Sequence, residues 1–259
     1  MRRHFLLLAF LAAFSGAVFA PPRALADEEY TTERITYRTS DGVNIAGTFF
    51  RPAKLRMQKV PVVIMLHMLS RSRNDWNAIA PLVMAEGYCA LAIDLRGHGE
   101  SLEFDQAGRT WREFGDGDFR SMLLDVSGAV SYLATRKEVN TDRIAIIGAS
   151  IGANLAINYA AQDRHVRTVV LLSPGLNYRG IETMPAAERY GTRAIMIVAS
   201  ESDNPSAADS RALYERLLDT ADPPKLKMYP GNRHGTDILS AGNGLDRIIM
   251  AWLNNNLLF

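Results

Sequence analysis

The feature that most constrains this chain is a serine placed between a buried strand and a helix. The apolar run Ile144–Ile147 predicts a short buried strand, and Gly148-Ala-Ser150-Ile151-Gly152 follows at once. A pattern rich in alanine and leucine, with helical spacing, begins directly after the second glycine. Such a junction holds Ser150 in a strained turn, exposed above the carboxyl end of a sheet, with the N–H of Ile151 beside it. We interpret Ser150 as a candidate nucleophile, and the alternative is a plain glycine-rich turn.

A histidine is needed beside such a serine, because a hydroxyl becomes a good nucleophile only when a base takes its proton. The sequence has five histidines, which are His4, His67, His98, His165 and His234. His234 follows the last predicted strand and precedes the last predicted helix, in a loop from which a side chain can reach over the sheet edge. We therefore predict that His234 is the base. The alternative is a loop histidine exposed to solvent.

An acid must then orient the imidazole and stabilise its charged form. Asp203 follows a predicted strand and lies between Ser150 and His234 in the chain. The order serine, acid, histidine is that of the α/β-hydrolases. We predict that Asp203 is this acid. Glu201 is a nearby competitor, and a helix-capping or merely solvated role for Asp203 is the alternative.

The hydrophobic pattern predicts an α/β fold. Alternating residues on either side of Ser40-Asp41-Gly42, at 33–38 and 43–50, predict an antiparallel hairpin. Apolar runs predict further strands at residues 60–66, 88–93, 166–172, 193–199 and 225–229. Helical periodicity predicts helices at 74–86, 118–136, 207–219 and 243–257, with Gly87 ending the first and Asp116 or Asp118 capping the second. This alternation predicts a mostly parallel central sheet with helices on both faces.

The first 26 residues have the layout of a secretory signal peptide. A basic start, Met1–His4, precedes the apolar stretch Phe5–Ala20, and Ala24-Leu-Ala26 offers small residues for cleavage before Asp27. We expect export to the periplasm or the medium and no stable membrane anchor. The alternatives are a retained anchor, for which the stretch is short, and a twin-arginine signal at Arg2-Arg3.

Composition limits the partners of the expected mature chain, a single domain at 27–259. Residues 1–26 contain three arginines and no acid, so their removal changes the formal net charge from +1 to −2. Without a basic excess to neutralise phosphates, nucleic acid is not an expected partner. Cys89 is the only cysteine, which excludes an internal disulfide, and its apolar surroundings predict a buried side chain.

Four stretches resemble the α/β-hydrolase superfamily, and they occur in that family's order: Leu66–Trp76, Asp94–Ser101, Gly148–Gly152 and His234-Gly235. Within it, the chain is most similar to dienelactone-hydrolase-like and serine-esterase-like members without a large cap. The family usually has His-Gly-x after its third strand, where the N–H of x binds the oxyanion. Here Met68 replaces that glycine, which places Leu69 at x and leaves either Met68 or Leu69 as the donor.

The resemblance implies hydrolysis of carboxylic esters through an acyl-enzyme. Ser150 would attack the carbonyl, and the N–H groups of Leu69 and Ile151 would bind the oxyanion. No metal or organic cofactor is expected. Only residues 176–191 occupy the place where many relatives insert a lid, so we expect an open cleft suited to small or soluble esters. Met68, Leu69 and Trp76 are candidates for its apolar wall, although core packing suits Trp76 equally well.

Two other stretches carry several polar side chains. The resemblance makes Asp94–Ser101 a structural turn rather than a catalytic segment. Asp116-Gly-Asp118 lacks the ligand spacing of a calcium loop, so we favour helix capping there.

Three other functions remain open at this point. A peptidase or a thioesterase would use the same three residues, because specificity lies in the shape of the pocket. A lipase or lysophospholipase acting at membranes is less favoured, and so is a non-catalytic exported binding protein. The natural substrate, the acyl length and the oligomeric state are left open.

Overall fold

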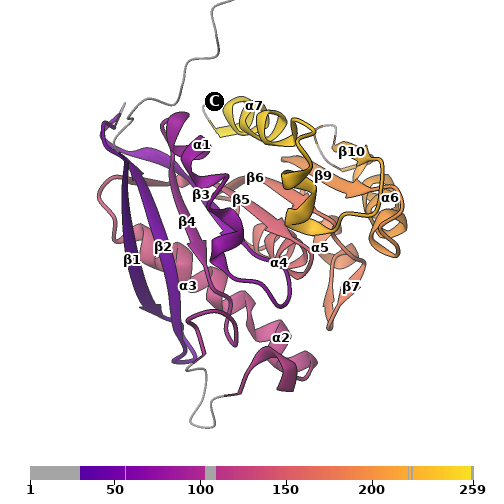
Figure 1. Cartoon of the computed structure of the whole chain (residues 1–259), viewed down its shortest axis with the longest axis horizontal. Coiled ribbons are helices and arrows are strands. Elements are labelled where there is room, and N and C mark those ends of the chain that lie inside the picture. Colours follow the sequence, from indigo (N-terminus) through magenta and orange to yellow (C-terminus); the bar gives the residue numbers. More distant parts are fainter. Residues whose placement is uncertain (1–29, 56, 103–108, 221, 223, 258–259) are drawn as a thin grey trace, which may run out of the picture.

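A central sheet of eight strands runs through the part of the chain that the structure describes (Figure 1). This computed structural model describes residues 30–55, 57–102, 109–220, 222 and 224–257, so the predicted signal peptide lies outside the described residues. The strands are β1 (Tyr30–Arg38), β2 (Asn44–Pro52), β3 (Val60–Leu66), β4 (Cys89–Ile93), β5 (Val139–Ala149), β6 (Val166–Leu172), β9 (Ala194–Ser200) and β10 (Lys225–Tyr229). Their order across the sheet is β1-β2-β4-β3-β5-β6-β9-β10.

Strand directions match the predicted class. β1 pairs antiparallel with β2, and β2 pairs antiparallel with β4, whereas the remaining neighbours are parallel. The mostly parallel sheet with an N-terminal antiparallel hairpin is therefore confirmed. Because parallel strands carry their carboxyl ends at one edge, the loops after β3, β5, β6, β9 and β10 meet there.

Helices cover both faces of the sheet (Figure 1). One face packs against α3 (Leu123–Ala134), α4 (Ile151–Ala160), α5 (Met184–Tyr190) and α6 (Ser206–Leu217), and the other against α1 (Ala80–Ala85) and α7 (Leu245–Leu257). Side chains of β3 alternate between the two layers: Ile64 joins the first and Met65 the second. This double burial explains why the central strands are continuous apolar runs.

Most strand boundaries agree with the sequence pattern to within one or two residues, but β1 and β5 begin earlier than expected. Two helices also differ from the prediction. The helix expected at 74–86 is a 3₁₀ turn, Arg73–Trp76, followed by α1. Pro81 lies in the first turn of α1, and its lack of an N–H prevents a helix from running continuously through this point. The helix expected at 118–136 is also divided, into α2 (Asp116–Ser121) and α3.

The division between α2 and α3 lies at Met122. The N–H of Met122 bonds to the carbonyl of Phe119, and that of Asp125 bonds to Met122, both in the tighter i to i+3 pattern. Asp118 accepts a hydrogen bond from the N–H of Gly115 at 3.0 Å. From the first turn of α2 it therefore gives a partner to the backbone N–H of the residue that precedes the helix.

The segment at 176–191 has more structure than the sequence indicated. It contains a two-stranded hairpin, β7 (Asn177–Tyr178) with β8 (Ile181–Glu182), and then α5. Two further 3₁₀ helices occur at Trp111–Glu113 and Gly235–Ala241. No large cap lies over the sheet in the described part of the chain.

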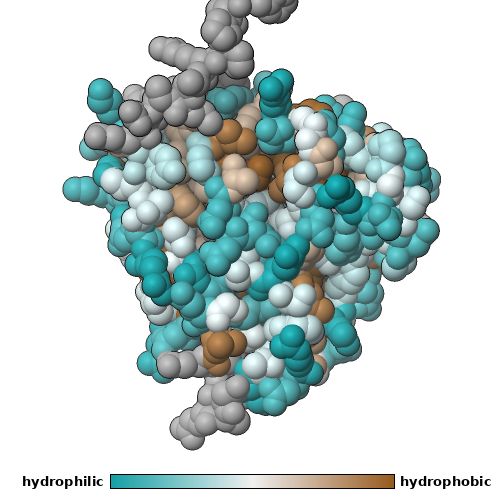
Figure 2. All heavy atoms as spheres, in the orientation of Figure 1, coloured by the Kyte–Doolittle hydropathy of each residue, from teal (hydrophilic) through white to brown (hydrophobic). Residues whose placement is uncertain are grey.

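The described surface is chemically mixed. Large hydrophobic side chains that are exposed come from separate parts of the chain: Tyr30, Met57, Leu102 and Leu218. On the face shown in Figure 2, most of the surface is hydrophilic and is interrupted by smaller hydrophobic areas. Within the described ranges, no helix is both long enough and apolar enough to cross a bilayer.

Candidate active site

Ser150 occupies the junction of β5 and α4 in a conformation that most residues avoid. Its φ is 54° and its ψ is −119°, and its N–H bonds to the carbonyl of Leu172 at 2.8 Å. A serine held at positive φ is strained, and such strain is typical of functional sites. Ser150 is only 7% exposed, so the expectation of an exposed serine is wrong.

The two glycines around Ser150 allow the chain to fold tightly on itself. A Cβ on Gly148 would lie 2.1 Å from the carbonyl oxygen of Gly152. One on Gly152 would lie 2.4 Å from the carbonyl oxygen of Leu66, at the end of β3. Neither distance is possible for a side chain, so the motif needs glycine at both positions. The close approach also places the loop after β3 directly beside the serine turn.

Asp203 and His234 form a hydrogen-bonded pair. Nδ1 of His234 lies 2.8 Å from Oδ2 and 3.1 Å from Oδ1 of Asp203. The aspartate side chain is 11% exposed and that of the histidine is 35% exposed. Nδ1 therefore donates to the carboxylate, which leaves Nε2 available as a proton acceptor. The carboxylate is occupied by the imidazole rather than by a helix N-terminus, and Glu201 is exposed.

The loop that carries His234 packs against the serine turn. A Cβ on Gly235 would lie 2.7 Å from Sδ of Met68 and 3.4 Å from Cβ of Ala149, the residue before Ser150. Residues far apart in the sequence, after β3, β5, β9 and β10, thus meet at one edge of the sheet. The structure brings the three predicted residues into one site. Their catalytic roles stay a prediction.

Ser173 connects two parts of this site and was not singled out from the sequence. It follows β6, is fully buried and has a φ of 51°. Its Oγ donates to Oδ2 of Asp203 at 2.9 Å and accepts from the N–H of Gly235 at 3.0 Å. Ser173 therefore fixes the carboxylate relative to the histidine loop. Its position directly after a predicted buried strand is the one sequence signal that could have identified it.

The peptide between Met68 and Leu69 has a defined orientation. The carbonyl of Met68 accepts hydrogen bonds from Nδ1 of His67 at 2.8 Å and from the N–H of Arg71 at 3.2 Å. In a trans peptide the N–H points opposite to the carbonyl, so the N–H of Leu69 faces away from His67. Among the described residues, this N–H and that of Ile151 have no backbone partner. The N–H of Met68 likewise has no backbone partner among the described residues, so the choice between Met68 and Leu69 as the second oxyanion donor stays open.

His67 and His98 are buried and belong to the scaffold. Nε2 of His67 accepts from the N–H of Leu95 at 3.0 Å, and the two imidazole rings lie 5.0 Å apart. The ring of His98 stacks on Trp111 at 5.6 Å. Burial lowers the pKa of each imidazole to about 4, so both are neutral at neutral pH.

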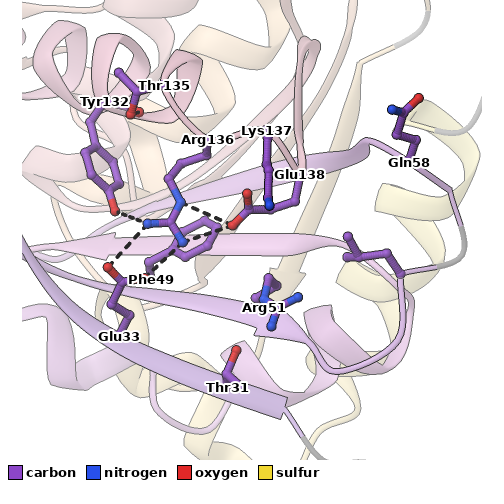
Figure 3. Close-up of a pocket in the computed structure, with 11 residues that line it drawn as sticks. Thr31, Glu33, Phe49, Arg51, Gln58, Tyr132, Thr135, Arg136, Lys137 and Glu138 are labelled. Atoms are coloured by element: carbon purple, nitrogen blue, oxygen red, sulfur yellow. Dashed lines mark hydrogen bonds and ion pairs between the residues drawn. The ribbon is translucent and has the colours of Figure 1, made fainter.

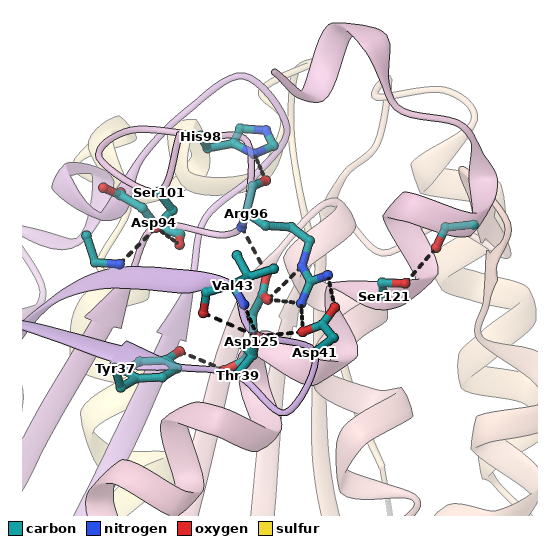
Figure 4. Close-up of polar contacts among 12 residues, drawn as sticks. Tyr37, Thr39, Asp41, Val43, Asp94, Arg96, His98, Ser101, Ser121 and Asp125 are labelled. Atoms are coloured by element: carbon teal, nitrogen blue, oxygen red, sulfur yellow. Dashed lines mark hydrogen bonds and ion pairs between the residues drawn. The ribbon is translucent and has the colours of Figure 1, made fainter. Parts of the chain in front are cut away.

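The segment 94–101 forms a turn held by buried ion pairs (Figure 4). Asp94 accepts from the backbone and guanidinium of Arg73, and Arg96 bonds to Asp125 and Asp41. These charged side chains therefore serve the scaffold, as the resemblance implied. Burial raises the pKa of Asp125 to about 6 even though Arg96 acts in the opposite direction.

The remaining candidates have ordinary structural positions. Trp76 is fully buried in the core, so it does not line a cleft, whereas Met68 is mostly buried and Leu69 is half-buried. Cys89 is buried in β4, and burial raises the pKa of its thiol to about 12. Within the described ranges, no cluster of three or more His, Cys, Asp or Glu residues could hold a metal ion.

A cavity of about 860 Å³ lies at the opposite edge of the sheet, where the parallel strands begin (Figure 3). Arg136 lies across its floor, over the ring of Phe49, and pairs with Glu33 and Glu138. None of the predicted site residues lines this cavity, so its size carries no information about the serine.

Solved structures of known hydrolases share this fold. The *Pyrococcus furiosus* esterase Pf2001 aligns over 92% of this chain and 100% of its own, with a TM-score of 0.68 and 17% identity. A dienelactone hydrolase from *Anabaena variabilis* aligns over 88% of this chain and 99% of its own, with a TM-score of 0.67 and 18% identity. The fold is therefore that of the α/β-hydrolases.

Residues 45–238 match the sequence profile of the dienelactone hydrolase family, and the chain belongs to that family. The quorum-quenching protein AidA of *Acinetobacter baumannii* is 27% identical over 136 residues, which are 52% of this chain and 41% of AidA. The chain spans 35% to 52% of the length of the curated relatives that it matches.

Proposed function

We propose that this protein hydrolyses carboxylic esters of small or soluble substrates. The observation that carries the proposal is the pairing of His234 with Asp203 beside a serine at positive φ. Membership of the dienelactone hydrolase family supports the same chemistry.

Each residue has a defined part in the proposed reaction. Nε2 of His234 takes the proton of Ser150 as Oγ attacks the ester carbonyl, and Asp203 stabilises the imidazolium that forms. The N–H groups of Leu69 and Ile151 bind the negative oxygen of the tetrahedral intermediate. His234 then returns the proton to the leaving alcohol. A water molecule activated by the same imidazole releases the acid and restores Ser150.

The preference for small or soluble substrates rests on what covers the serine. Between β6 and β9 the described chain places only the β7–β8 hairpin and α5. Ser150 is nevertheless mostly buried, so we expect a narrow acyl group to reach it more readily than a branched or bulky one.

Steady-state hydrolysis of matched substrates tests the proposal. The panel contains p-nitrophenyl esters of increasing acyl length, an acyl thioester and an aminoacyl anilide. We expect acetate and butyrate esters to give the highest kcat/KM. Ser150→Ala and His234→Ala should each lose at least about 10³-fold. His165→Ala is the matched control, because His165 is an exposed histidine that pairs with Asp163.

Two outcomes would change the assignment. Faster cleavage of the anilide or the thioester than of every ester would make the protein a peptidase or a thioesterase. Unchanged ester hydrolysis in both Ser150→Ala and His234→Ala would remove the proposed mechanism.

We also propose that residues 1–26 direct export and are then removed. The basic start, the apolar stretch and the small residues at Ala24-Leu-Ala26 support this. Intact-mass measurement of the protein from the extracytoplasmic fraction should give a chain that begins at Asp27. Recovery of the uncleaved chain in the cytoplasm would contradict it.

A further inference from the structure

Tyr178 lies over the candidate active site, on the hairpin that the sequence did not predict. Arg179 and Gly180, which connect β7 to β8, have φ values of 52° and 77°. Two consecutive residues at positive φ give the tight hairpin turn that matches the twist of its strands. The position of Tyr178 is therefore set by a short turn rather than by a long loop.

The phenol of Tyr178 contacts several groups of the site. Its hydroxyl lies 2.7 Å from Oγ of Ser206 and donates to the carbonyl oxygen of Ser173 at 3.4 Å, and the side chain of Ser150 is near enough to lower the pKa of the phenol. Its ring meets that of His234 edge to face, with 6.5 Å between the centroids. Tyr178 thus lies against both the proposed nucleophile and the proposed base.

The hairpin is held by the same helix that begins at the serine turn. Asn154 of α4 is fully buried, donates to the carbonyl of Ile181 at 2.7 Å and accepts from the N–H of Gly175 at 3.1 Å. The Tyr178 ring packs on Gly175, where a Cβ would lie 2.7 Å from the ring. These contacts hold the phenol in place before any substrate binds, which is the condition for a useful catalytic dipole.

The phenol keeps its proton at neutral pH. Burial raises the pKa of Tyr178 above its usual value, although hydrogen bonds with Ser206 and Ser150 act in the opposite direction. A protonated phenol has one hydrogen to donate. In the proposed mechanism Ser150 gives its own proton to His234, so its Oγ can then accept the hydrogen of Tyr178 in place of the carbonyl oxygen of Ser173.

We propose that Tyr178 is a catalytic residue whose hydroxyl donates a hydrogen bond to Oγ of Ser150. This hydrogen bond stabilises the negative charge on Oγ when His234 removes its proton, and again when the bond between Oγ and the acyl carbon breaks. Tyr178 keeps its proton throughout, while the proton of Ser150 moves to His234 and then to the leaving alcohol. The inference rests on the proposed function.

The rate of serine labelling by a small fluorophosphonate tests this role, because it reports the reactivity of Oγ without a specific acyl pocket. Tyr178→Phe removes the hydroxyl and keeps the ring. We expect its labelling rate and its kcat for p-nitrophenyl acetate to fall by the same factor, roughly 10- to 100-fold. KM should change little.

Tyr190→Phe is the matched control. It removes a buried hydroxyl from α5, where that hydroxyl donates to the carbonyl of Ala194 at 2.7 Å, outside the site. Both rates should stay within about twofold of wild type, since no reacting group is touched. A Tyr178→Phe enzyme that is labelled at the wild-type rate would overturn the inference. So would a loss confined to KM, which indicates a pocket wall.

A crystal structure of wild-type protein phosphonylated on Ser150 gives a second test that needs no variant. The Tyr178 oxygen should lie about 3 Å from Oγ, within hydrogen-bonding distance, and a separation above about 4 Å would overturn the inference. Failure of wild type itself to be labelled on Ser150 would instead refute the proposed function.

Discussion

At the scale of single residues, the site depends on buried hydrogen bonds that hold charged or reactive groups in place. Ser173 is the clearest case, because its hydroxyl serves Asp203 and the N–H of Gly235 together. A buried polar group that loses its partner costs more than an average hydrogen bond contributes. Removing this hydroxyl should therefore affect both stability and catalysis.

We predict that Ser173→Ala lowers kcat about 10-fold and the free energy of unfolding by about 1–3 kcal/mol. The reason is that the Gly235 N–H and one carboxylate oxygen of Asp203 lose a partner. Ester hydrolysis and urea denaturation measure the two effects. Ser210→Ala is the control, since Ser210 is equally buried and its hydroxyl has no partner among the described residues. Equal behaviour of the two variants would contradict this role.

The sequence identified Ser150, Asp203 and His234 because each lies at the end of a recognisable strand. Tyr178 does not follow such a strand, and Ser173 does follow one but lies in no motif that distinguishes it. Ser173 is one serine among many, and Tyr178 depends on a hairpin of two-residue strands, which is too short for a periodic pattern. The burial of Ser150 also could not be predicted, because it depends on residues that are distant in sequence, such as Tyr178.

At the scale of elements, the arrangement depends on how closely the turn after β5 approaches the end of β3. Gly152 lies at that contact, and the carbonyl of Leu66 leaves no room for a side chain. The atoms that a side chain at residue 152 would meet belong to the backbone, so they cannot move aside as the end of a flexible side chain could.

We predict that Gly152→Ala lowers the free energy of unfolding by about 3 kcal/mol or more and abolishes activity. Gly117→Ala is the control: Gly117 is exposed in α2, and alanine there should stabilise the protein by about 0.5–1 kcal/mol. Thermal denaturation followed by circular dichroism distinguishes these results. A Gly152→Ala protein as stable as wild type would show that β3 can move away from the turn.

Strands were predicted more accurately than helices, and the reason is physical. The bounds of β3 and β6 equal the expected ranges, because strands covered on both faces are largely apolar and end abruptly at polar loops. The bounds of the edge strand β10 also agree, although it is only partly buried and contains two lysines. The interruptions at Pro81 and Met122 do not disturb the spacing of apolar residues, so the periodic pattern continued through them.

At the scale of the whole molecule, buried ionisable groups connect stability to pH. His67 and His98 have folded pKa values of about 4, below the usual 6.5, because both are buried. Between these values the unfolded chain binds more protons than the folded one, so lowering the pH favours unfolding. Asp125 acts in the opposite sense, because burial raises the pKa of its carboxyl group to about 6. Below that pH the folded protein binds this proton more readily than the unfolded chain does.

We predict a net loss of stability on the order of 2 kcal/mol between pH 7 and pH 5, since two imidazoles outweigh one carboxyl. His98→Gln should reduce this loss by about half or more. Urea denaturation at the two pH values measures both proteins. The groups that face His98 are His67, Asp94 and the ring of Trp111, and none of them is changed in this variant. Equal stability of wild type at the two pH values would contradict the prediction.

The most direct test of the proposed mechanism is to find which residue a fluorophosphonate modifies in the folded protein. Peptide mapping by mass spectrometry of wild type, Ser150→Ala and Asp203→Asn gives the answer. We expect a single adduct on Ser150 in wild type, none in Ser150→Ala, and at least about 100-fold slower labelling in Asp203→Asn. An adduct on another residue, or ester hydrolysis that continues in Ser150→Ala, would show that the site at this edge of the sheet is not the catalytic one.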